Sequence, residues 1–152
     1  HPNSNVQVGQ KFVADVVNGL LASSVWPTSA LFLTYDEHGG FYDHVVPPPA
    51  PIPDGLGPQG HPFESFNQYG IRVPAVVISP YSKAHFVSHV VNDLTSILKF
   101  IETRFALPSL TARDAAADPM FDYFDFNTAA FATPPSLPAA VIDQAQLNLC
   151  PG

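Results

Sequence analysis

The 152 residues of this chain suffice for one domain with a hydrophobic core. Hydrophobic residues make up 46% of the sequence and charged residues only 12%, against about 25% in an average soluble protein, which predicts a lightly charged and mostly buried chain. With 6 basic and 13 acidic residues the net charge is -7, which argues against nucleic acid or an anionic membrane as a partner.

The sequence predicts no membrane helix, signal peptide or internal disulfide. No stretch approaches the roughly 18 continuous apolar residues of a membrane helix, and the opening HPNSN has neither the basic start nor the apolar run of a signal peptide. The opening also lacks a methionine, as a fragment or a processed piece would. Cys150 is the only cysteine, so the sequence predicts no internal disulfide.

The first predicted elements are a helix and a strand. Apolar residues from Val6 to Leu21 recur at steps of three and four, which predicts an amphipathic helix lying on a sheet. Trp26 and Pro27 break this pattern. The run Ser29–Tyr35 is short, apolar and bulky, and it predicts a strand buried on both faces, as in α/β sheets.

A loop follows, and then a second strand and helix. Prolines and glycines are too dense from Val46 to Gly70 for a helix or central strand, so we expect a long surface loop beside a site. Val73–Ser79 predicts a second buried strand, and Asn92 or Asp93 caps a helix that continues to Phe105. This order predicts a layered α/β domain. The chain after Leu107 is expected to be loop-like, and its last twenty residues extended and poorly packed.

The segment TYDEHGGFYDHVVPP carries the chemistry, because ligand sites in α/β sheets gather at the carboxyl ends of strands. Asp36 and Glu37 would point to opposite faces of a continuing strand, so they can serve one ion only if the strand ends before them. Gly39 and Gly40 supply the freedom for such a turn. Carboxylates bind calcium, magnesium or manganese, and a nearby histidine adds zinc or iron.

Plainer interpretations stay open at this point. An acidic pair after a strand also occurs as a cap or a surface turn. His38 and His44 fit loop histidines, as do His85 and His89 before the second helix. The aromatic residues between Phe121 and Phe126 are better explained by a carboxy-terminal segment tucked onto the core than by a lipid-contacting patch.

TYDEHGGFYDHVVPP resembles the signature of the phosphoesterase family that contains phosphatidylcholine-type phospholipases C and acid phosphatases. GIRVPAVVISPYSK, from Gly70, and NDLTSILKFIETRFALPSLTARDA, from Asn92, are similar to the family's carboxy-terminal region in order and spacing. So are the opening HPNSN and the helix after it. The resemblance covers His1 to about Phe126, as the carboxy-terminal part of the domain, and leaves residues 127–152 as an extended tail.

The resemblance implies an alkaline-phosphatase-like α/β fold, a layered sheet with flanking helices, of which this chain is a part. A metal-assisted nucleophile would form a phosphoenzyme that water then hydrolyses. Asp36 and Glu37 match metal ligands, and His1 matches a histidine that contacts the phosphate. His38 and Asp43 are candidates for holding the ligands or the turn in place. A histidine that commonly follows the aspartate of the last helix is absent here, so its role is not carried over.

The resemblance further implies a secreted or periplasmic hydrolase of phospholipids or other phosphate esters, with calcium, zinc or manganese as its divalent ion. The family's amino-terminal half supplies the remaining ligands and the nucleophile, so we expect this chain alone to be inactive or nearly so, and to need that half as a partner. A noncatalytic, truncated domain that binds a metal or a partner is one alternative. A sulfatase-like or phosphoglycerate-mutase-like protein is another, against which the signature argues.

Overall fold

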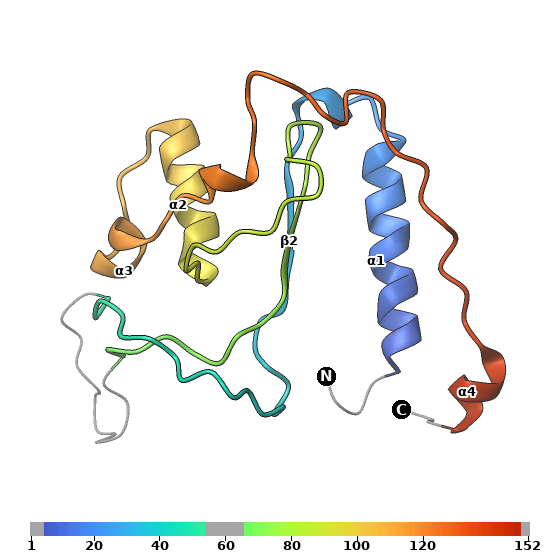
Figure 1. Ribbon diagram of the computed structural model, residues 1–152, viewed down its shortest axis with the longest axis horizontal. Coiled ribbons are helices and arrows are strands. Elements are labelled where there is room, and N and C mark those ends of the chain that lie inside the picture. The colour runs from blue at the N-terminus through green and yellow to red at the C-terminus, as the bar shows by residue number, and fades with distance from the viewer. Residues whose placement is uncertain (1–4, 54–65, 150–152) are drawn as a thin grey trace.

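The computed structural model describes residues 5–53 and 66–149, and Figure 1 shows their arrangement. A two-stranded ribbon stands in the middle, with α1 on one side of it and α2 and α3 on the other. The elements are, in chain order, α1 (Val6–Leu21), η1 (Trp26–Thr28), β1 (Leu31–Thr34), β2 (Ala75–Ile78), α2 (Leu94–Phe105), α3 (Ala112–Ala116), η2 (Phe121–Tyr123) and α4 (Gln144–Leu149).

The sheet among the described residues consists of β1 and β2. They pair antiparallel, with Leu31 opposite Ile78 and Thr34 opposite Ala75. Both strands lie where the sequence predicts them, but the expectation that they are buried on both faces is wrong. Every residue of β1 is half-buried and the first two of β2 are exposed, because the described residues supply neither a third strand nor a helix along each face. Helices and a small sheet confirm the mixed α/β composition.

The first core cluster joins the end of α1 to the ribbon. Val17 and Leu21 of α1 pack with Trp26, whose side chain is 2% exposed and whose Nε1 donates to the carbonyl of Phe131 at 3.0 Å. Leu31 and Ile78 of the strands, together with Val13 and Leu20, are half-buried against this cluster. The bounds of α1 are those predicted. Figure 1 shows α1 standing beside the ribbon. Its contacts with the strands come from the second half of the helix, between Val13 and Leu21.

A second, aromatic cluster fixes α2 to the ribbon. The ring of Phe100 lies 4.9 Å from that of Phe32 in β1 and 5.3 Å from that of Phe124, and Phe124 stacks on Phe126 at 5.0 Å. The segment around Phe121–Tyr123 is thereby held against α2 and β1. This packing confirms that the aromatic residues tuck a carboxy-terminal segment onto the core.

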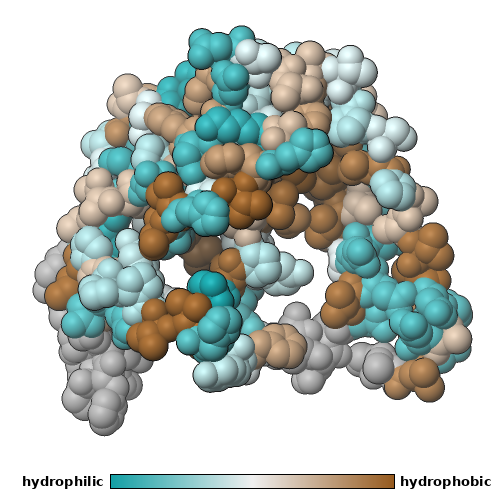
Figure 2. All heavy atoms as spheres, in the orientation of Figure 1, coloured by the Kyte–Doolittle hydropathy of each residue, from teal (hydrophilic) through white to brown (hydrophobic). Residues whose placement is uncertain are grey.

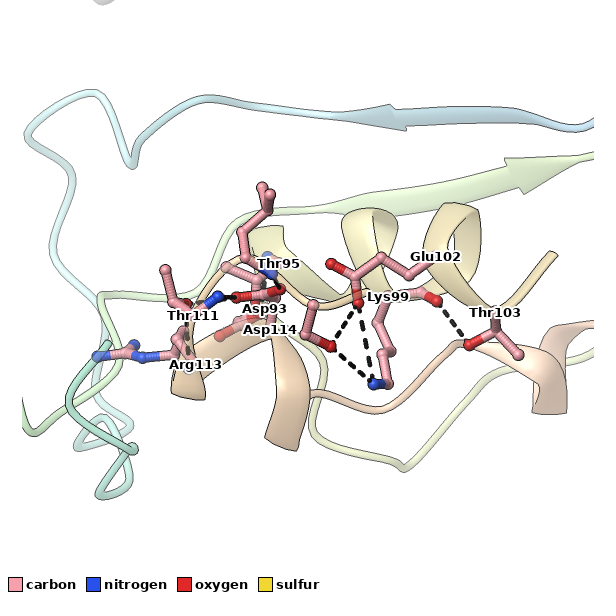
Figure 3. Close-up of polar contacts among 10 residues, drawn as sticks. Asp93, Thr95, Lys99, Glu102, Thr103, Thr111, Arg113 and Asp114 are labelled. Carbon is pink, nitrogen blue, oxygen red and sulfur yellow. Dashed lines mark hydrogen bonds and ion pairs between the residues drawn. The ribbon is translucent and has the colours of Figure 1, made fainter. Parts of the chain in front are cut away.

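The chain after Leu107 is not all loop, since it forms the helix α3, and Figure 3 shows the polar contacts at the start of this helix. The Asp114 side chain accepts hydrogen bonds from the backbone N–H of Leu110 at 2.6 Å and of Thr111 at 2.7 Å, and from the Thr111 hydroxyl. Thr111 in turn caps the helix by accepting from the N–H of Arg113. This capping box, a threonine followed three residues later by an acid, is a sequence signal for a helix start that the sequence analysis missed.

The tail runs back beside α1, as Figure 1 shows in orange and red. It ends in the short helix α4, so the last twenty residues are not extended throughout, although α4 contains no buried residue. The N–H of Asp143 donates to Gln7 Oε1 at 2.6 Å and ties the tail to the start of α1. In the described part of the chain, none of the helices has the length and apolarity needed to cross a membrane.

Candidate functional site

The acidic turn, residues 35–42, follows directly on β1. The strand ends at Thr34, before Asp36 and Glu37. This is required if both side chains are to bind the same ion. The backbone then reverses through Gly39 and Gly40, whose φ angles of 67° and 78° lie in the left-handed region that favours glycine. Both predicted features of this segment, the end of the strand and the glycine turn, are confirmed.

The acidic turn bulges out of a ribbon that continues beyond β1 and β2. Thr34 pairs with Ala75 at one end of the turn, and Asp43 binds Arg72 at the other. We call residues 35–53, which follow β1, the first arm, and residues 66–74, which precede β2, the second arm. Residues 35–42 on the first arm therefore face only residues 73–74 on the second. Farther out the two arms stay together, since Pro49 and Gln68 form an isolated bridge. The turn is thus an outward loop with both of its ends tied.

The carboxylates of Asp36 and Glu37 are both exposed. Glu37 Oε2 accepts a hydrogen bond from the N–H of Gly39 at 2.7 Å. Asp36 makes no hydrogen bond or ion pair with another described residue. The turn therefore presents one unengaged carboxylate beside one that is partly engaged by its own backbone, and hard cations favour such oxygen ligands.

His38 lies within the acidic turn. Its Nδ1 accepts a hydrogen bond from the N–H of Gly40 at 3.0 Å. Nδ1 also lies 3.4 Å from Glu37 Oε2. Both contacts of His38 lie within the acidic turn, and its predicted role of holding the ligands or the turn in place stays a prediction.

Asp43 directly follows the acidic turn and is more constrained than Asp36 and Glu37, with a side chain only 11% exposed. Its Oδ2 accepts from Arg72 Nε at 2.7 Å and its Oδ1 from Arg72 Nη2 at 2.8 Å, while the N–H of Val45 donates to Oδ1 at 3.1 Å. These hydrogen bonds, first those from Arg72 and then that from Val45, hold the pKa of Asp43 well below its usual range. His44 beside it is 81% exposed and fits a loop histidine.

Arg72 is a residue that the sequence analysis missed. It lies 29 residues from Asp43 along the chain, and only the pairing of the two arms brings them together. The one signal in the sequence was a lone arginine just before the second predicted strand. The two residues border an open groove of about 390 Å³ whose lining also includes His38, Phe41, Tyr42, Ile71, Val73 and Pro74.

Other predicted residues lie elsewhere. His1 is outside the described residues. His85 and His89 are exposed on the segment between β2 and α2, which agrees with their interpretation as loop histidines. Among residues 5–53 and 66–149, no group of three or more histidines, cysteines and acids could hold a metal ion. The acidic turn therefore offers at most two carboxylate ligands.

Comparison with known proteins gives the class. The sequence model of the phosphoesterase family matches residues 1–108. Phospholipase C B of Mycobacterium tuberculosis is 39% identical over 99% of this chain and 31% of its own length. Two Arabidopsis thaliana proteins are similar: non-specific phospholipase C1 is 42% identical over 82% of this chain and 26% of its own, and non-specific phospholipase C5 is 47% identical over 77% and 25%.

These matches settle the family predicted from the motifs: the chain belongs to the phosphoesterase family. It spans less than a third of the length of the curated relatives named above. The signature, from Thr34 to Pro48, lies inside the matched region, and so do Arg72 and the whole of α2.

Proposed function

We propose that this chain supplies one part of a metal-dependent active site that hydrolyses phosphate esters. The observation that carries the proposal is the acidic turn, which presents Asp36 and Glu37 where a strand ends, with the Asp36 carboxylate unengaged by described residues. Membership of the phosphoesterase family and relatives that are named as phospholipases C support it. The substrate class proposed is phospholipids or smaller phosphate esters.

Asp36 and Glu37 are the proposed ligands of a divalent cation: calcium, zinc or manganese. Their exposed carboxylate oxygens suit such an ion, and the strand ends at Thr34, so the alternation that would point them to opposite faces does not extend to them. The cation, when bound, polarises a phosphoryl oxygen and neutralises charge that develops in the transition state. His38 and Asp43 hold the turn that carries the two carboxylates.

Two carboxylates are fewer ligands than a divalent ion takes, since zinc binds four and calcium six to eight. The remaining ligands and the nucleophile are therefore proposed to come from sequence that the longer relatives contain and this chain does not. His1, which lies outside the described residues, is proposed to contact the phosphate. This chain alone is expected to turn over little or no substrate.

The rest of the domain is the proposed partner of this chain. α2 presents an exposed apolar stripe at helical spacing, formed by Leu94, Leu98, Ile101 and Phe105. Figure 2 shows apolar side chains at the surface around the central hollow of one face of the molecule. Such surfaces fit a domain whose layered sheet is completed by further polypeptide. A secreted or periplasmic location is proposed from the resemblance to the family.

The test places this sequence in a chain of the relatives' length, for example in exchange for the matching third of the mycobacterial phospholipase C B. Hydrolysis of chromogenic phosphate monoesters and diesters is measured after removal of metal and after addition of calcium, zinc or manganese. Activity is expected to depend on one of these ions and to fall by more than about 100-fold in Asp36→Asn. Asp15→Asn, which changes an exposed acid of α1, is the control.

Full activity in Asp36→Asn would contradict the proposal. A noncatalytic domain that binds a metal or a partner without turnover is the second candidate, which the exposed apolar stripe of α2 favours as a surface for a partner. It predicts that the hybrid chain binds the ion and hydrolyses neither class of ester.

A further inference from the structure

We infer that the ion pair between Asp43 and Arg72 is a clamp that sets the shape of the acidic turn, so that both residues act as positioning residues for Asp36 and Glu37. The inference deepens the proposed function and rests on it for the role of the two carboxylates. The structural part, a turn ordered by its clamp, stands on the geometry alone.

The clamp supplies one of the two ends of the turn. At the other end, Thr34 pairs with Ala75 and its hydroxyl donates to the carbonyl of Pro74 at 3.0 Å. Between the ends, the hydrogen bonds that the structure gives residues 35–42 are local ones. The N–H groups of Gly39, Gly40 and Phe41 donate to residues of the turn itself, and the Thr34 hydroxyl also lies 3.5 Å from the carbonyl of Tyr35. The position of the turn relative to the second arm therefore depends on its ends.

Loss of the clamp would lengthen the untied segment. The next contacts between the arms are those from Gln68 Nε2 to the carbonyl of Pro47 at 2.7 Å and from the N–H of Tyr69 to the carbonyl of Pro48 at 3.0 Å. Without Asp43 and Arg72, the first arm would be free of the second from residue 35 to residue 46. A longer untied loop samples more conformations, so the two carboxylates would be held in one geometry for less of the time.

The chemistry of the pair suits a rigid clamp. The guanidinium donates two parallel hydrogen bonds to the two oxygens of one carboxylate, which fixes orientation as well as distance. The N–H of Val45 adds a third donor to Asp43. A lysine would supply the charge but not the fork, so Arg72→Lys keeps a cation at the groove and loses the geometry.

Arg113 offers a matched control, because it ties the same two arms at a different place. Its Nε donates to the carbonyl of Pro51 at 2.6 Å, and its Nη2 donates to the carbonyl of Phe66. Both contacts lie beyond the bridge between Pro49 and Gln68. Removal of this arginine leaves the ends of the acidic turn tied.

The experiment measures backbone order in the 152-residue chain by 15N relaxation of the Gly39 and Gly40 amides. Order parameters of about 0.85 are expected in the parent chain and in Arg113→Met, and values below about 0.6 in Arg72→Met and Asp43→Asn. The order parameters of Arg72→Lys are expected to lie between these two values. Circular dichroism confirms that each variant keeps its helices, and Arg72→Lys and Asp43→Asn replace Arg72→Met if it unfolds. Unchanged order parameters in folded clamp variants would overturn the inference.

A titration of the same chains with calcium and with zinc separates this inference from the proposed function. If the parent chain binds an ion that Asp36→Asn loses, Arg72→Met is expected to weaken binding by about 10- to 100-fold and Arg113→Met to leave it unchanged. Equal affinity in Arg72→Met and the parent would overturn the link between the clamp and the carboxylates. A parent chain that binds neither ion counts against the proposed metal site, while the order parameters still decide whether the clamp orders the turn.

Discussion

Asp36 and Asp114 show how differently two aspartates of this chain are used. Asp36 is exposed and unengaged by described residues, whereas the side chain of Asp114 is among the most buried and accepts three hydrogen bonds at the start of α3. Burial raises the pKa of Asp114, but hydrogen bonds from the Thr111 hydroxyl and the N–H of Leu110 outweigh it and hold the pKa well below the usual range. Asp114 is structural, and Asp36 is free to bind a ligand.

The pH dependence of stability is therefore predicted to fall partly on Asp114. A pKa that is lower in the folded than in the unfolded chain adds stability above the unfolded value of about 3.9, and this stability is lost as the pH falls through the folded value. Asp114→Asn should lower the melting temperature at pH 7 and flatten its decline below about pH 4. Thermal melts between pH 2 and 7 test this. Asp15→Asn, an exposed acid paired with Lys11, should keep the parent's acid limb, and an identical limb in Asp114→Asn would contradict the account.

At the scale of elements, α1 and α2 end differently although alanine stands at the C-cap of both. Ala22 follows α1 with a φ of -83°, an ordinary helical value. Ala106 follows α2 with a φ of 52°, in the left-handed region, where a side chain is strained and glycine is favoured. The end of α2 thus carries a local conformational cost.

Ala106→Gly is predicted to stabilise the chain by about 1 kcal/mol, because glycine removes the left-handed strain. Urea unfolding followed by circular dichroism measures the change. Ala22→Gly is the matched control and should destabilise, since glycine gains nothing at a φ of -83° and loses more entropy on folding. Equal effects of the two substitutions would show that the backbone of Ala106 is not strained.

At the scale of the whole molecule, exposed apolar surface is the dominant feature. The stripe of α2 is 39% to 63% exposed from Leu94 through Leu98 and Ile101 to Phe105. Apolar stripes of this kind associate in water. The isolated chain is therefore predicted to self-associate as its concentration rises.

Leu94→Glu with Phe105→Lys should suppress that association without lowering the helix content, because an acid at the start and a base at the end of α2 both complement the helix dipole. Sedimentation velocity over a range of concentrations measures it. Val87→Glu with Val141→Lys places the same charges at residues 73% and 80% exposed but outside the stripe, and should leave association unchanged. Association that persists in the first variant would mean that the stripe is not the surface involved.

Periodicity and turn chemistry predicted much of this molecule. The apolar repeat ending before Trp26 gave the bounds of α1, and the glycines after Glu37 predicted the turn. Contacts distant in sequence could not be predicted in this way, since Asp43 meets Arg72 only through the pairing of two arms whose register the sequence does not state. The burial of the strands was misjudged for a related reason, because apolar runs indicate what could be covered and not what covers it.

The most direct test of the central claim, that Asp36 and Glu37 hold a divalent cation, is calorimetric titration of calcium, zinc and manganese into the purified chain. A variant with Asp36→Ala and Glu37→Ala is titrated beside it, with Asp15→Asn as the control. The account predicts weak binding of at least one ion to the parent and the control, abolished in the double variant. Binding that survives in the double variant, or none to the parent, would contradict it.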